Sequence, residues 1–186
     1  MPLENLLAAI PEYAKDLRLN LATLLRQNTL TPQQFWGAAA ASAIAGRNAA
    51  VISEILSEAH AQLSPQAFQA AGTAAAIMSM NNVYYRFLHL TENEKYTTIP
   101  AGLRMNGLRG HGVDQSDFEL WCTAVSAINN CAVCVKAHEQ ALRRQGVSEG
   151  VILAAVRVAA VVQAISVVFD AEAAPKHLAA LEPRML

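Results

Sequence analysis

The sequence predicts an all-α protein built from a duplicated multi-helix unit. Three observations predict this class. Apolar residues recur at helical spacing along nearly the whole chain, and no segment alternates for long as a β-strand would. The pairs Thr31-Pro32 and Ser64-Pro65 each place a capping side chain before a proline at the first helical position. An aperiodic stretch at 91–112, which contains glycine and proline, separates two segments of similar pattern.

The composition narrows the class of protein. A hydrophobic content of 53% with 16% charged residues argues against disorder, and 186 residues are enough to bury a core. A net charge of −1 and a pI near 6.5 leave no basic surface for nucleic acid. Three cysteines are too few for a secreted disulfide scaffold, and residues 1–30 lack the features of a signal peptide. We therefore expect a cytoplasmic protein.

Six helices are expected before the aperiodic connector. The third begins at a capping box formed by Thr31 and Gln34, and Gly46 is a helix-ending residue. Ser64-Pro65 begins the fifth in the same way as the third. The predicted ranges are 3–10, 12–26, 32–45, 48–62, 65–79 and 82–88.

Four helices are expected after the connector, at 115–128, 131–144, 148–168 and 173–182. Gly146 ends one of them and Ser148 starts the next. The segment Val151–Phe169 is apolar enough to resemble a membrane span, but Arg157 and Gln163 interrupt it. Because an arginine near the centre of a span costs about 2.5–3.5 kcal/mol, a buried helix without membrane contact is the better interpretation.

The two halves of the chain have similar patterns. A shift of 83 residues places Leu30–Trp36 over Val113–Glu119, and each half then continues with a second helix and a serine-started third helix. We predict a single domain, 1–186, with a scaffold half at about 30–88 and a catalytic half at about 113–170. The first half lacks the reactive groups of the second and has other residues at the four matching positions, namely Trp36, Asn48, Val51 and Ile55.

The reactive groups of the second half lie in one short run. Cys131 and Cys134 form a Cys-x-x-Cys pair, and His138 follows four residues later. On a helix these side chains share one face. Two thiols one turn apart can close a disulfide, and the imidazole one turn beyond Cys134 can take its proton. The spacing predicts a Cys131–Cys134 disulfide in the oxidised protein, with Cys122 as a buried free thiol that has no base beside it.

Two effects oppose each other in deciding which thiol reacts first. If Asn130 is the N-cap, Cys131 occupies the first helical position, where the helix dipole favours a thiolate and a large protein disulfide has better access. His138 lies one turn from Cys134 but two turns from Cys131. A specific base outweighs a dipole effect of about 0.3–1 kcal/mol, so we expect Cys134 to be the nucleophile and Cys131 its partner.

Other interpretations of these residues are open on spacing alone. The cysteines could be small apolar core residues. Cys131, Cys134 and His138 could ligate zinc with Glu119 as a fourth ligand, although three ligands on one helix make a strained tetrahedron. Glu119 also ends a capping-box pattern that begins at Ser116, and spacing alone favours this capping role over catalysis.

The segment Phe118–Glu139 strongly resembles the active-site stretch of the alkylhydroperoxidase D (AhpD) family, within the carboxymuconolactone decarboxylase-like superfamily. The shared core is a glutamate twelve positions before the first cysteine, the Cys-x-x-Cys pair and a histidine four residues on. Arg104-Met-Asn, Gly146-Val and Asn81-Asn-Val-Tyr also resemble the family, so the resemblance spans most of the chain.

The resemblance implies an all-α fold, usually assembled as a homotrimer, with no bound cofactor. It implies an antioxidant enzyme that reduces alkyl hydroperoxides or a partner peroxiredoxin and is itself reduced by a dihydrolipoyl group on an acyltransferase subunit. It assigns the sulfenic acid to Cys134, the proton donor and disulfide partner to Cys131, and a proton relay to His138 and Glu119. Within this resemblance the relay role of Glu119 outweighs capping.

Two positions depart from the family pattern. Val133 stands where relatives often carry a polar or aromatic residue, which would alter the thiol pKa, and Asn130 replaces a frequent glycine. Neither change removes a required group.

The rival enzyme is a non-redox decarboxylase or lactone-processing member of the superfamily, which has no need of two thiols. The rival from another class is a zinc-stabilised helical interaction module.

Overall fold

The computed structural model describes residues 3–181, with side chains described as far as residue 174. Within that range all regular structure is helical, which confirms the all-α prediction. The elements, in chain order, are α1 Glu4–Ala9, η1 Glu12–Ala14, α2 Lys15–Leu24, α3 Pro32–Gly46, α4 Ala49–Gln62, α5 Pro65–Thr91, α6 Glu94–Thr97, η2 Asn106–Leu108, α7 Gln115–Ile128, α8 Ala132–Arg144 and α9 Glu149–Leu181.

The predicted helix starts at Thr31 and Ser64 are confirmed by their hydrogen bonds. The Gln34 backbone N–H donates to Thr31 Oγ1 at 3.2 Å, and Gln34 Oε1 accepts from the Thr31 N–H at 3.1 Å, so the capping box is complete. Ser64 Oγ accepts from the Ala67 N–H at 3.1 Å. These side chains satisfy backbone donors that the first turn of a helix leaves without partners.

Two predicted helix breaks are wrong. The ranges 65–79 and 82–88 form one helix, α5, and the ranges 148–168 and 173–182 form one helix, α9, as far as Leu181. Residue 182 lies outside the described residues. Neither predicted gap contains proline or glycine, the residues that strongly disfavour a helix interior. The predicted helix 12–26 is instead divided between η1 and α2.

Gly46 ends α3 as predicted, but for a different reason. The left-handed residue that closes the helix is Arg47, with φ 66°. A Cβ atom on Gly46 would lie 2.6 Å from Ser166 Oγ on α9, so the glycine permits close packing of the two helices. Gly146, by contrast, has φ 79° and takes the left-handed conformation after α8.

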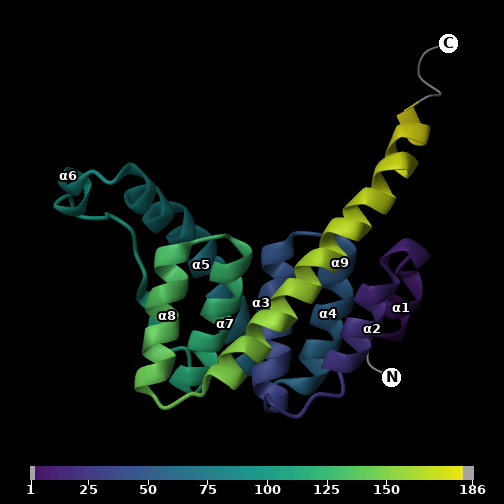
Figure 1. Ribbon diagram of the computed structural model, residues 1–186, viewed down its shortest axis with the longest axis horizontal. Helices are drawn as coiled ribbons and strands as arrows, with labels where there is room; N and C mark the ends of the chain where they lie inside the picture. Colours follow the sequence, from purple (N-terminus) through teal and green to yellow (C-terminus); the bar gives the residue numbers. More distant parts are fainter. Residues whose placement is uncertain (1–2, 182–186) are drawn as a thin grey trace.

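Helix α3 lies at the centre of the bundle and packs against α4, α5, α7 and α9. It is rich in buried alanines, and a Cβ atom on Gly37 would overlap the Trp121 ring on α7. Trp121 Nε1 also donates to the Gln34 carbonyl oxygen at 3.2 Å. Figure 1 shows α9 crossing the bundle, with its C-terminal end projecting beyond the other helices. The close approach of α3 and α7 joins the two halves of the chain.

The segment Glu149–Ala174 of α9 is long and apolar enough to cross a membrane by length and composition. In the structure it packs against α3 and α7, and core helices of soluble proteins meet the same criteria. The predicted halves each contain three consecutive helices, α3–α5 and α7–α9. The internal duplication itself stays a prediction. Helix α5 of the first half packs against α7 and α8 of the second half, and these three helices carry the candidate site.

Candidate active site

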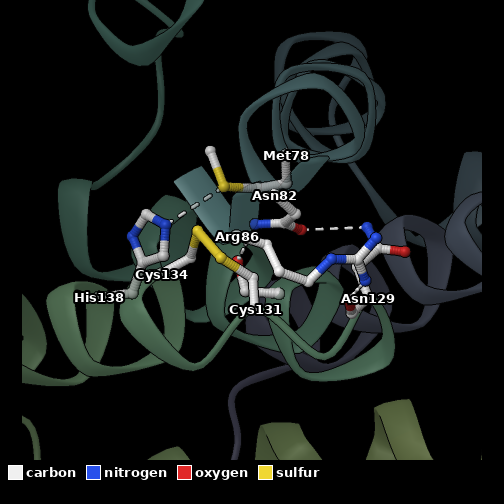
Figure 2. The surroundings of a disulfide bond; sticks show 8 residues. Met78, Asn82, Arg86, Asn129, Cys131, Cys134 and His138 are labelled. Carbon is white, nitrogen blue, oxygen red and sulfur yellow. Dashed lines mark hydrogen bonds between the residues drawn. A yellow bond between two sulfur atoms is a disulfide. The ribbon is translucent and has the colours of Figure 1, made fainter. Parts of the chain in front are cut away.

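Cys131 and Cys134 form a disulfide at the start of α8, with their Cα atoms 5.3 Å apart (Figure 2). The predicted N-cap at Asn130 is wrong, because Asn130 adopts a left-handed conformation with φ 54° that turns the chain after α7. Cys131 is therefore the N-cap, and Cys134 lies in the first turn of the helix. The pair still spans one turn, as its spacing predicts.

The two cysteines differ in access to solvent. Cys131 is 0% exposed and Cys134 is 6% exposed. The expectation that Cys131 offers better access to a large protein disulfide is wrong for this structure, because its cap position places it in the α7–α8 turn. There its N–H donates to the Ser126 carbonyl oxygen at 3.1 Å. Cys134, together with His138, lines a cavity.

His138 lies between a carboxylate and a thioether. Its Nδ1 is 2.6 Å from Glu119 Oε2 on α7, and its Nε2 is 3.2 Å from Met78 Sδ on α5. Figure 2 shows the imidazole beside Cys134, with Nε2 directed to Met78. When the ring hydrogen is on Nδ1, beside the Glu119 carboxylate, Nε2 is the nitrogen that can accept a proton. The structure thus brings together the four residues predicted for the site, Glu119, Cys131, Cys134 and His138.

Glu119 does not cap α7. The N-cap is Asp114, whose Oδ1 accepts from the Ser116 N–H at 2.8 Å, and the helix begins at Gln115. The predicted capping box from Ser116 to Glu119 is therefore wrong, because an aspartate two residues earlier supplies the capping oxygen. Glu119 lies one turn inside the helix, where its side chain faces His138.

The pKa of Glu119 reflects two opposing influences. Burial raises the pKa, but the hydrogen bond and charge of His138 and a hydrogen bond from Gln115 together lower it below the usual value. Gln115 Nε2 donates to Glu119 Oε1 at 2.9 Å, and Gln115 Oε1 lies 3.1 Å from His111 Nε2. The carboxylate is therefore ionised at neutral pH. Sequence reasoning missed Gln115, whose one available signal was its position four residues before Glu119.

Glu119→Gln should lower the rate at which the Cys134 thiol reacts about tenfold or more, because the neutral amide cannot stabilise a protonated His138. It should also change the pH dependence of stability. Since the folded pKa of Glu119 is depressed, the carboxylate stabilises the protein above the ordinary glutamate pKa of about 4.3, and this contribution is lost as pH falls through the folded value. Urea unfolding from pH 7 to 3 should show the variant and the native protein converging at low pH. Full activity of Glu119→Gln would limit the relay to His138.

A cavity of about 300 Å³ opens beside Cys134 and His138. Helix α5, the connector and the first two turns of α8 form its walls, which are almost entirely apolar. The residues that line it in addition to Cys134 and His138 are Met78, Asn81, Tyr85, Met105, Leu108, Val133 and Ala137. Such a cavity suits a small molecule with an apolar body whose reactive end meets the Cys134 sulfur.

A hydrogen-bonded group on α5 holds the turn that carries Cys131. Arg86 Nη1 donates to the Asn129 carbonyl oxygen at 2.8 Å. Asn82 Oδ1 accepts from Asn129 Nδ2 at 3.0 Å, and Asn82 Nδ2 donates to Ser126 Oγ at 3.0 Å. Figure 2 shows Asn82 and Arg86 reaching from α5 toward this turn. The position of Cys131 therefore depends on side chains about fifty residues away in sequence.

Cys122 is a free, buried thiol, as predicted. Burial raises its pKa well above the usual value, and the negative charge of Glu119 adds to this effect, so the thiolate is disfavoured. Among the described residues, no three His, Cys, Asp or Glu side chains are grouped so that they could hold a metal ion.

Comparison with known proteins finds one family and close relatives. The model of the carboxymuconolactone decarboxylase family matches residues 95–177. A protein of Acidobacterium capsulatum is 57% identical over 173 residues, which cover 92% of this chain and 94% of that protein. A protein of Solibacter usitatus is 53% identical over 94% of this chain and 99% of its own length, and one of Koribacter versatilis is 56% identical over 92% and 89%. All three are named alkyl hydroperoxide reductase AhpD.

Proposed function

The chain belongs to the AhpD family of alkyl hydroperoxide reductases, and we propose that it reduces peroxides with the Cys131–Cys134 pair. The observation that carries this proposal is the shared position of Cys134 and His138 on the wall of an apolar cavity, with Glu119 behind the imidazole. The catalytic residues would be Cys134, Cys131, His138 and Glu119, and no bound cofactor is needed for their chemistry.

The first step forms a sulfenic acid. His138 Nε2 takes the proton of the Cys134 thiol, and the thiolate attacks the terminal oxygen of the hydroperoxide. The O–O bond breaks, Cys134 is oxidised to the sulfenic acid, and the alkoxide takes the proton from His138 and leaves as the alcohol. Glu119 orients the imidazole and stabilises its charge while it holds the proton.

The second step forms the disulfide. The Cys131 sulfur attacks the Cys134 sulfur, the S–S bond forms, and the sulfenic hydroxyl leaves with the Cys131 proton as water. An external dithiol then reduces the disulfide by exchange through a mixed disulfide. The reduction of one hydroperoxide to one alcohol and one water thus consumes two thiols.

The reductant, partners and assembly extend the family resemblance. A dihydrolipoyl group on an acyltransferase subunit would serve as the dithiol that reduces the Cys131–Cys134 disulfide. An oxidised peroxiredoxin would be a second substrate that the protein reduces. The protein would act in the cytoplasm. The homotrimer is what the family resemblance implies; the exposed apolar side chains near α6 support an interface with another protein chain, because such groups are commonly covered at protein interfaces. This surface is formed by Phe87, Leu90, Tyr96 and Ile99, on the arm that projects from the bundle in Figure 1.

Thiol counting tests the proposed function. One equivalent of tert-butyl hydroperoxide should lower the free thiols of the fully reduced protein from three to one and yield one equivalent of alcohol. All three cysteines lie in the tryptic peptide 110–136, so the count is repeated with Cys122→Ala, which should lose both remaining thiols. A bridge to Cys122 would overturn the site. An unchanged count would favour the non-redox decarboxylase, and stoichiometric zinc in the purified protein would favour the interaction module.

A further inference from the structure

Asn81 is a buried polar side chain without a hydrogen-bond partner. The residue is 5% exposed, and its Oδ1 accepts no hydrogen bond. Among the described residues only two other buried side-chain atoms share this condition, Ser42 Oγ and Gln163 Oε1, and neither residue lines the cavity of Cys134. A buried amide without a partner costs free energy, so its presence calls for a physical reason.

The neighbouring residue shows what a structural asparagine does in this protein. Asn82 is 1% exposed, and both ends of its amide are paired, one with Ser126 and the other with Asn129. Figure 2 shows Asn82 directed toward the α7–α8 turn, whereas Met78, one turn earlier on α5, is directed to His138. Asn81 lines the cavity with Met78, Cys134 and His138. Of the two adjacent amides, one is hydrogen-bonded to α7 and the turn that follows it, and the other lines the cavity that contains the Cys134 sulfur.

We propose that the Asn81 amide binds the peroxide group of the substrate. This inference rests on the proposed function. The cavity walls match an apolar alkyl group, but a hydroperoxide also brings an O–H donor and two acceptor oxygens into a space that offers few polar groups. Asn81 supplies an acceptor, Oδ1, for the terminal O–H and a donor, Nδ2, for the inner oxygen. The substrate thereby provides the partners that the amide lacks.

The amide has a second effect during the reaction. When the Cys134 thiolate attacks the terminal oxygen, the O–O electron pair moves to the inner oxygen, which leaves as an alkoxide. A hydrogen bond from Asn81 Nδ2 to that oxygen strengthens as the negative charge develops, before His138 delivers its proton. Asn81 is then a catalytic residue, and the increase in rate that it provides depends on the basicity of the leaving group. An alkoxide gains much from a donor, and a carboxylate, which is a weak base, gains little.

Asn81→Leu tests this dependence with two small peroxides that differ in leaving group. The rate of thiol loss in the reduced protein is measured with tert-butyl hydroperoxide and with peracetic acid, and the rate of Cys134→Ser is subtracted as background. We expect the rate with the hydroperoxide to fall about 10²–10³-fold, the cost of removing one such donor, and the rate with the peracid to fall less than about tenfold. The denaturation midpoint of Asn81→Leu should be unchanged or higher, because an unpaired amide is removed.

Two variants provide controls. Asn82→Leu breaks paired hydrogen bonds, so it should lower the denaturation midpoint without a preference between the two peroxides. Asn81→Asp keeps the size of the side chain and its acceptor oxygen but has an oxygen in place of the donor NH₂ group. It should therefore also lose rate with the hydroperoxide more than with the peracid, and it serves as the test if Asn81→Leu fails to fold. Equal losses with both peroxides, or no loss, in a folded Asn81 variant would overturn the role of Asn81 while native activity sustains the proposed function. A native protein that reduces neither peroxide would overturn both.

Discussion

Cys134→Ser should abolish peroxide turnover, whereas Cys131→Ser should react with one equivalent of peroxide and stop as a sulfenic acid. Cys134 lines the cavity beside His138, and Cys131 is fully buried in the turn behind it. In Cys134→Ser the Cys131 thiol has no base one turn away, so its reaction should be slower by about 10²-fold or more. Serine is a favourable N-cap residue, so Cys131→Ser should keep the start of α8 intact.

The measurement is sulfenic-acid labelling after a brief peroxide pulse, followed by intact mass. Each variant is also made with Cys122→Ala, so that any label reports on one cysteine. Faster labelling of Cys134→Ser than of Cys131→Ser would reverse the two roles and leave the family assignment in place. Labelling at Cys122 would contradict its burial and raised pKa.

His138→Phe should lower turnover about 10²–10⁴-fold, the usual contribution of a general base, with a much smaller loss of stability. The phenyl ring fits a largely buried position, and Gln115 still donates to Glu119 after the histidine is removed. Steady-state peroxide consumption and urea unfolding measure the two effects separately. A loss of stability large enough to account for the lost activity would show that His138 is structural.

A double-mutant cycle isolates the relay. If Glu119 acts through His138 alone, adding Glu119→Gln to His138→Phe should cause no further loss of turnover. In the native background the same change should slow the enzyme, because the imidazole is present to be oriented. Additive losses would mean that the carboxylate acts on the reaction independently of the histidine.

The start and end of a helix could be predicted from the sequence where residues within one turn determine them. They could not be predicted where contacts with distant residues determine them. Thr31 and Ser64 start helices because the capping groups and prolines act within one turn. The break predicted before Asn82 does not occur, because helix propensity is a weak influence and this side chain is paired with groups on α7. Asp114 and Ser116 are both good capping residues, and spacing alone did not identify which one begins α7.

The candidate site was predictable only in part for the same reason. Cys131, Cys134 and His138 share one helix, so their sequence spacing already places them on one face. Met78 and Asn81 reach the site from α5, more than forty residues earlier, and no local pattern indicates that these two side chains meet the cysteines. The cavity, and with it the substrate contacts, is a property of the packed bundle.

The one-turn separation of the cysteines also affects how well the enzyme resists inactivation by excess peroxide. A sulfenic acid can be oxidised further by a second peroxide to a sulfinic acid, which thiols do not restore. That damage is second order and accelerates with peroxide concentration, whereas closure of the disulfide is first order and independent of it. With Cα atoms 5.3 Å apart and the turn held from α5, the resolving sulfur needs little travel to reach its target. A short tether thus lets the enzyme tolerate an oxidant burst.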